Sequence, residues 1–93
     1  MEEKVVYSIS YDLSAPNRNY DDLYTAIKSF GDWWHQSGSV WFIKTDKESA
    51  VIRDYLMQFI DGNDKIFVIE VKRNWAGFGF TEKEYNWIKS ALQ

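Results

Sequence analysis

Hydrophobic and polar residues alternate at the start of the chain and predict a β-strand over residues 4–12. One face of this strand carries Val5, Tyr7, Ile9 and Tyr11, and the other carries Val6, Ser8, Ser10 and Asp12. The first face suits a hydrophobic core, whereas the second is small and largely polar. We therefore expect a sheet with one face covered by the core and the other exposed or covered by a partner.

Helical periodicity follows at three places in the chain. The first helix is expected after a cap at Asn17 or Asn19, with a stop at Gly31, and its buried residues are Tyr20, Leu23, Tyr24, Ile27 and Phe30. The second follows a predicted capping box from Thr45 to Glu48, ends at Gly62, and buries Ile52, Tyr55, Leu56, Phe59 and Ile60. The third follows the box from Thr81 to Glu84 and turns Tyr85, Ile88 and Leu92 inward.

Between these helices the pattern predicts strands at 33–35, 39–44 and 65–71, with a bend at Ser37-Gly38. The strand at 39–44 is apolar on both faces, which indicates an inner strand or an interface. Residues 72–80, KRNWAGFGF, form either a short edge strand or a folded loop. The order predicts one α+β domain over residues 1–93, ferredoxin-like βαββαβ, with an antiparallel sheet, two helices on one face and a C-terminal helix.

Composition narrows the function classes. The chain has no cysteine, which excludes disulfides, thiolate catalysis and the usual structural zinc sites, and suits a reducing cytosol. No apolar run approaches membrane-spanning length, and the acidic N-terminus lacks the apolar centre of a signal peptide. We expect a cytoplasmic protein without membrane association. A chain of this length buries a modest core, and dimerisation would add stability.

The formal net charge is −3, whereas proteins that bind nucleic-acid backbones usually carry a basic excess. A local basic patch remains an alternative, since Lys72 and Arg73 are adjacent and Arg18 and Lys44 fall near predicted strand ends. The other interpretation of these residues is as ordinary solvated charges.

Three segments together resemble the small CRISPR-associated Cas-two family and its relatives, which include the virulence-associated protein D toxins. They are SYDLS at 10–14, QSGSVWFIK at 36–44 and NDKIFVIEV at 63–71, and the similarity of order spans residues 4–71. The resemblance implies a homodimer whose sheets meet across the interface. It also implies a divalent metal, Mg²⁺, between the strand-end aspartates of the two subunits, the position of Asp12 here. A metal-bound water would then be the nucleophile.

Two hypotheses of function follow. In the first, the protein is a Mg²⁺-dependent endonuclease for RNA or DNA: Asp12 holds the metal, Ser10 or Ser14 assists its waters, and Arg18, Lys72 and Arg73 contact phosphate. In the second, it is a non-catalytic homodimer that binds a protein partner as a regulator or an assembly subunit. The family commonly has a basic stretch where this chain reads APNRN, and a strand where the tail predicts a helix. These departures and the acidic charge favour the second hypothesis.

Several candidate residues have a structural alternative. Asp12 could cap the following loop through an Asx-turn. His35 has no evident catalytic partner, which is typical of a packed or solvated histidine. The tryptophans could stack bases or fill a core or interface; the candidates are Trp33, Trp34, Trp41 and Trp75. The DGND segment at 61–64 is predicted to be a turn rather than a calcium loop.

Overall fold

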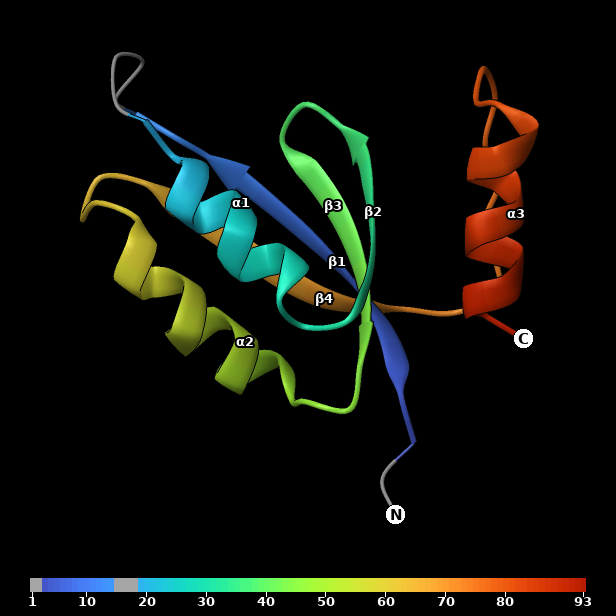
Figure 1. Ribbon diagram of the computed structural model, residues 1–93, viewed down its shortest axis with the longest axis horizontal. Coiled ribbons are helices and arrows are strands. Elements are labelled where there is room, and N and C mark those ends of the chain that lie inside the picture. Colours follow the sequence, from blue (N-terminus) through green and yellow to red (C-terminus); the bar gives the residue numbers. More distant parts are fainter. Residues whose placement is uncertain (1–2, 15–18) are drawn as a thin grey trace.

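The computed structural model describes residues 3–14 and 19–93, in which four strands and three α-helices follow the predicted order (Figure 1). The elements are β1 (Val5–Asp12), α1 (Asp21–Lys28), β2 (Asp32–Ser37), β3 (Val40–Thr45), α2 (Ser49–Leu56), β4 (Lys65–Val71) and α3 (Glu82–Ala91), with a 3₁₀ turn at Met57–Phe59 after α2. The predicted strands at 33–35 and 39–44 are confirmed with slightly shifted bounds. The chain is thus a mixed α+β domain.

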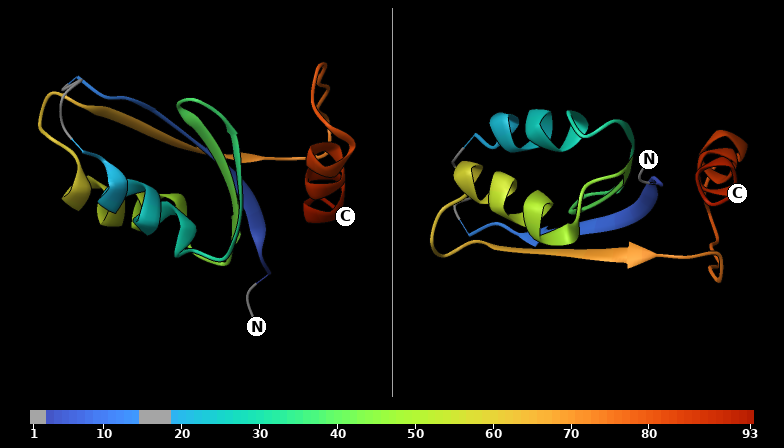
Figure 2. Two further views of the ribbon diagram at one scale, coloured as in Figure 1. Left: turned by 45° about the horizontal axis from the view of Figure 1, so that its top comes forward. Right: turned by 90° about the horizontal axis from the view of Figure 1, so that it is seen from below.

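The strands form one antiparallel sheet in the order β2-β3-β1-β4. The central strand β1 pairs with β3 and β4, so that β2 and β4 form the two edges. Of the two alternatives for the strand after the Ser37-Gly38 bend, an inner strand or an interface, the inner strand is confirmed. Figure 2 shows α1 and α2 side by side over one face of the sheet, whereas α3 stands apart beyond the end of β4.

The core lies between the sheet and the pair α1 and α2. The expected inward face of β1 supplies Tyr7 and Ile9, and β3 supplies Trp41 and Ile43. Tyr20 and Ala26 also belong to the cluster, together with four fully buried helix residues: Leu23, Ile27, Ile52 and Leu56. The predicted helical stripes therefore meet the predicted strand face, and burial of these side chains is the main contribution to folding.

The helix starts agree with the sequence only in part. The side chain of Asn19 accepts a hydrogen bond from the N–H of Asp21 at 2.8 Å, although Tyr20 occupies the N-cap position; Asn17 lies outside the described residues. The predicted box at Thr45–Glu48 is wrong, because α2 begins at Ser49 without a side-chain cap. The hydroxyl of Thr45, the last residue of β3, instead accepts from the N–H of Lys47 at 3.3 Å.

The C-terminal part of the chain packs against the sheet mainly at β2. Residues 72–80 contain neither helix nor strand, so the folded loop is the alternative that holds. The capping box of Thr81 and Glu84 opens α3 as predicted. Trp87 of α3 packs on Trp34, with ring centroids 5.9 Å apart. Since Trp34 alternates with the core-facing Trp33, α3 packs against the face of β2 that α1 and α2 leave uncovered. None of the helices in the described residues is long and apolar enough to cross a membrane.

Candidate functional site

Asp12 is the last residue of β1 and is exposed to solvent. Its register partner in β4 is Lys65, and both residues line a shallow hollow of about 440 Å³ that also includes Ser10 and Phe67. The cation beside Asp12 is therefore Lys65, which is not among the basic residues predicted for the site. Its identity follows from the antiparallel register, which brings the start of β4 to the end of β1.

The carboxylate that connects the loops at this end of the sheet by hydrogen bonds belongs to Asp64. It accepts hydrogen bonds from the backbone N–H and hydroxyl of Ser14, at 2.7 and 2.9 Å, and from the N–H of Asp61 at 2.8 Å. The hydroxyl of Tyr20 also donates to it, at 3.1 Å. These donors, the backbone N–H of Ser14 first, lower the pKa of Asp64 to about 2. The loop after β1 is therefore capped at the backbone N–H of Ser14 by the carboxylate of Asp64, and not by Asp12 as the Asx-turn alternative proposed.

The predicted basic residues do not gather around Asp12. Arg18 lies outside the described residues. Lys72 and Arg73 directly follow β4, whereas Asp12 pairs with the first residue of that strand. Seven residues of strand separate them, which corresponds to roughly 24 Å. Within one chain, Asp12 and these two cations therefore lie at opposite ends of the sheet.

A magnesium site would need more ligands than one subunit supplies. The described residues contain no group of three or more Asp, Glu, His or Cys side chains that could hold a metal ion. Mg²⁺ is commonly bound by one or two carboxylates together with waters and substrate phosphates. Asp12 supplies one such carboxylate, and the second carboxylate of the nuclease hypothesis would be the Asp12 of a partner subunit.

His35 and three of the four candidate tryptophans serve packing. The imidazole of His35 stacks on the indole of Trp41 with centroids 3.9 Å apart, and its Nε2 lies 2.9 Å from the carbonyl oxygen of Gly38. Trp41 is buried, and Trp33 packs against it at 5.6 Å. Trp34 stacks on Phe42 at 5.3 Å. These contacts agree with the structural interpretation of these residues.

The uncovered face of the sheet is apolar along its β4 edge. Phe67 is 62% exposed and Ile69 is 51% exposed, and both face away from the core. In the register of β1 they lie opposite Ser10 and Ser8, whose short side chains leave them protruding. Large apolar side chains on an unpaired edge strand are unusual in a protein that acts alone. We call Phe67 and Ile69 the β4 strip.

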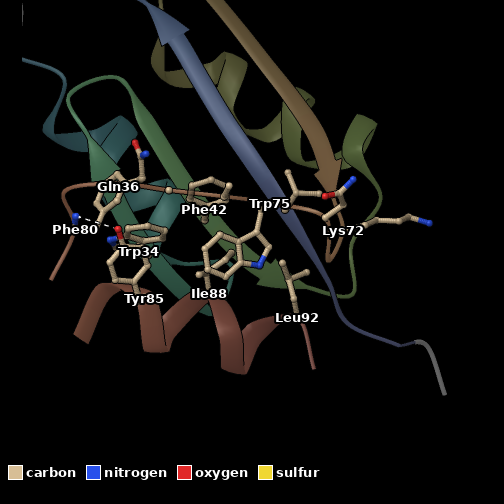
Figure 3. A pocket seen from close by; sticks show the side chains of 13 residues that line it. Trp34, Gln36, Phe42, Lys72, Trp75, Phe80, Tyr85, Ile88 and Leu92 are labelled. Carbon is tan, nitrogen blue, oxygen red and sulfur yellow. Dashed lines mark hydrogen bonds between the residues drawn. The ribbon is translucent and has the colours of Figure 1, made fainter. Parts of the chain in front are cut away.

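A second feature lies between the sheet and α3 (Figure 3). Thirteen residues enclose a cavity of about 300 Å³, and five of them are aromatic. We call it the aromatic cavity; its rings belong to Trp34, Phe42, Trp75, Phe80 and Tyr85. The rings of Trp75 and Tyr85 are nearly parallel, at 17°, with centroids 6.4 Å apart. The only charged lining residue is Lys72, and in Figure 3 its side chain points out of the cavity.

The aromatic cavity adjoins a second, more polar hollow of about 370 Å³, with which it shares Val71, Lys72 and Leu92. We call it the basic hollow, because its charged side chains are three cations and one carboxylate: Lys4, Lys72, Arg73 and Glu70. Lys72 lies 4.0 Å from Glu70, and the Nε of Arg73 donates to the carbonyl of Leu92 at 3.1 Å. The sequence indicated Lys72 and Arg73 as a basic pair but gave no sign of the cavity beside them.

No protein-family model matches the chain. No solved structure matches it either.

Proposed function

We propose that this chain is a ferredoxin-like binding protein without catalytic activity, similar in class to the Cas-two family, which acts as a homodimer and as a regulatory or assembly subunit. The strand order β2-β3-β1-β4 and the position of α1 and α2 after β1 and β3 support the fold class. The observation that carries the functional proposal is the β4 strip, which leaves Phe67 and Ile69 exposed on an edge strand.

A second copy fits this edge in a defined register. Two β4 strands related by a two-fold axis through Val68 would pair antiparallel, with Phe67 opposite Ile69 of the partner subunit on the uncovered face. Aromatic and β-branched residues in opposed positions stabilise antiparallel pairs by about 0.2–1 kcal/mol each. A small hollow of about 180 Å³ lies between β4 and the start of α2, where it is lined by Ser49, Ala50 and Phe67 among others.

Charge complementarity supports the same arrangement. In the Val68-centred register, Lys65 would lie opposite the partner's Val71. Asp12 lies beside Lys65 on the other side, so it would be two strand spacings, or roughly 10 Å, from the partner's Lys72 and Arg73, which directly follow that valine. Each end of the dimer would then combine a carboxylate of one subunit with cations of the other. The two β4 strips would join into one apolar surface for a protein partner.

This dimer separates the two copies of Asp12. Because Lys65 lies three residues from the two-fold axis, the two Lys65 positions and their Asp12 neighbours would be about 20 Å apart along the strands. A shared Mg²⁺ needs ligand oxygens within about 2.1 Å of the ion. The dimer paired through β4 is therefore incompatible with the metal site of the nuclease hypothesis.

Cysteine cross-linking tests the proposal directly, since the native chain has no cysteine. The double variant Phe67→Cys/Ile69→Cys should form a covalent dimer on mild oxidation, because opposed residues in antiparallel strands lie within disulfide range. The variant Val51→Cys, at an exposed position of α2, controls for random collisions. A wild-type protein that stays monomeric in light scattering, or cross-linking no faster than in the control, would contradict the proposal.

The endonuclease remains the alternative, favoured by the position of Asp12 at the exposed end of β1. It requires a different dimer, in which an Asp12→Cys variant cross-links readily. Wild type and Asp12→Ala would be incubated with single- and double-stranded RNA and DNA in the presence of Mg²⁺ or Mn²⁺. Cleavage by wild type alone would establish the enzyme and overturn the binding proposal, whereas no cleavage, or equal cleavage by both, excludes catalysis by Asp12.

A further inference from the structure

We infer that the aromatic cavity and the adjoining basic hollow together bind a small planar aromatic anion, a ring system that carries a carboxylate or a phosphate. This site lies apart from the β4 strip and is formed within one chain, although its Lys72 and Arg73 are also the cations that the proposed dimer would bring near the partner's Asp12. Its lining combines residues of β2 and β3 with the loop at 72–80 and α3, the part of the chain that follows the segments resembling the Cas-two family.

The cavity has the size and walls of a ligand site. Its volume of about 300 Å³ is at the lower end of the usual range for small-molecule pockets, which are mostly apolar with a few polar groups. The edge-to-face contact of Trp34 with Phe80, at 5.5 Å, and the stacking of Trp34 on Phe42 form one aromatic wall. Trp75 and Tyr85 form the other. Walls of this kind favour a flat, polarisable ring over an aliphatic chain.

One polar group fixes the position of the second wall. The hydroxyl of Tyr85 accepts a hydrogen bond from the N–H of Phe80 at 3.4 Å, drawn as a dashed line in Figure 3, and keeps its own proton for donation. Gly77 allows the loop to approach closely, since a Cβ at this position would lie 3.4 Å from the ring of Tyr85. The loop at 72–80 is therefore shaped around the ring of Tyr85 rather than collapsed into the cavity.

The charged residues around the cavity favour a ligand whose ring carries an acidic group. No acidic residue lines the aromatic cavity, although the chain as a whole has a net charge of −3. Its single charged residue, Lys72, is shared with the basic hollow, where Lys4 and Arg73 outnumber Glu70. The side chain of Lys72 is 83% exposed and free to reorient toward an anion at the mouth. A ring in the cavity would thus place its acidic group over the cations.

Two probes share this chemistry, and they distinguish an aromatic acid from a nucleotide: indole-3-acetate and adenosine monophosphate. Each is titrated into the full chain by calorimetry and by backbone amide NMR, with indole and adenosine as neutral counterparts. We expect at least one anion to bind with shifts concentrated at residues 72–80 and in α3, and its neutral counterpart to bind more weakly. Lys72→Gln should weaken the anion about two- to fivefold and leave the neutral counterpart unchanged.

Trp75→Ala should weaken both the anion and its neutral counterpart at least about fivefold, because it removes a stacking wall. Val51→Ser, at an exposed position of α2 away from the cavity and from β4, is the matched control and should bind the probe as wild type does. The inference fails if neither anion binds at millimolar concentration, if the neutral counterparts bind equally well, or if Trp75→Ala has no effect. Should Trp75→Ala fail to fold, the amide shifts of the wild type decide, and shifts confined to β4 would overturn the site.

Discussion

The hydroxyl of Tyr11 joins β1 to the β2–β3 hairpin, and its removal should destabilise the fold measurably. It accepts a hydrogen bond from the indole Nε1–H of Trp41 at 3.0 Å and donates to the carbonyl of Gly38 at 3.2 Å. Trp41 is 2% exposed, so that its N–H has little access to water once the partner is removed. Tyr11→Phe deletes this oxygen and retains the ring.

The magnitude follows from the two groups that lose a partner. A buried donor left without an acceptor costs about 1–3 kcal/mol. The carbonyl of Gly38 still faces Nε2 of His35 at 2.9 Å, so its loss adds little. We expect the free energy of unfolding to fall by about 1–2 kcal/mol, and the melting temperature by about 4–8 °C for each kcal/mol in a domain of this size.

Urea denaturation followed by tryptophan fluorescence, together with calorimetry, measures both quantities. Tyr55→Phe is the matched control, because this half-exposed tyrosine keeps its ring contacts with Phe30 and Phe59 when the hydroxyl is removed. Trp41→Phe in the Tyr11→Phe background completes a double-mutant cycle, and the coupling should be at least about 0.5 kcal/mol. A Tyr11→Phe protein as stable as the Tyr55→Phe protein would refute the reasoning.

Three further substitutions test local features. The folded protein lowers the pKa of the Asp64 carboxyl from 3.8 to about 2. The stability that this carboxylate contributes is therefore complete above pH 3.8 and is lost as the pH falls toward 2. Asp64→Asn should destabilise the protein at neutral pH, and urea denaturation should show a flatter dependence of its stability on pH in this range. Thr81→Ala removes the side-chain cap of α3 and should lower stability by about 0.5–2 kcal/mol. The pKa of Glu84 is lowered chiefly by the backbone N–H of position 81, which alanine keeps, so NMR should show only the partial rise that follows from loss of the Thr81 hydroxyl. Gly31→Ala should lower the melting temperature, because φ is +134° at this residue and a Cβ would lie 3.0 Å from the carbonyl oxygen of Lys44. Gly62→Ala is the control and should have little effect, because a Cβ there would have no neighbouring atom within 4 Å.

The sequence predicted the elements and the core because periodicity is a local property that burial then enforces. The alternation of Tyr7 and Ile9 in β1 and the spacing of Leu23 and Ile27 in α1 led to the observed core. The Thr45–Glu48 box failed because Thr45 remains the last residue of β3 and is itself buried, so that its hydroxyl serves the turn instead of the helix.

The site was harder to predict, because it depends on contacts distant in sequence. The role of Asp64 rests on Ser14, fifty residues away, and no local pattern indicates that pairing. Trp34 and Tyr85 are distant in sequence and come together in the aromatic cavity because α3 packs against β2. Tryptophan and tyrosine content indicated aromatic packing somewhere, whereas the position of the cavity required the tertiary structure.

The salt dependence of association separates the two dimers that the chain could form. In the dimer paired through β4, Asp12 faces the partner's Lys72 and Arg73 at roughly 10 Å, which is about one Debye length at 0.1 M salt. Added salt would screen this attraction, and the dimer dissociation constant should rise with NaCl concentration. In the metal-bridged dimer of the nuclease hypothesis, two Asp12 carboxylates repel each other, so salt would favour association and Mg²⁺ would favour it at much lower concentration.

Sedimentation equilibrium across a series of NaCl concentrations, with and without Mg²⁺, measures this sign. The Asp12→Asn variant is the matched control: it should weaken a β4-paired dimer at low salt and become equal to wild type at high salt, because only the screened contribution is removed. Tighter association of Asp12→Asn at low salt would instead indicate that the two Asp12 carboxylates face each other. That result would refute the β4-paired dimer and with it the separation of the two Asp12 side chains on which the non-catalytic proposal rests.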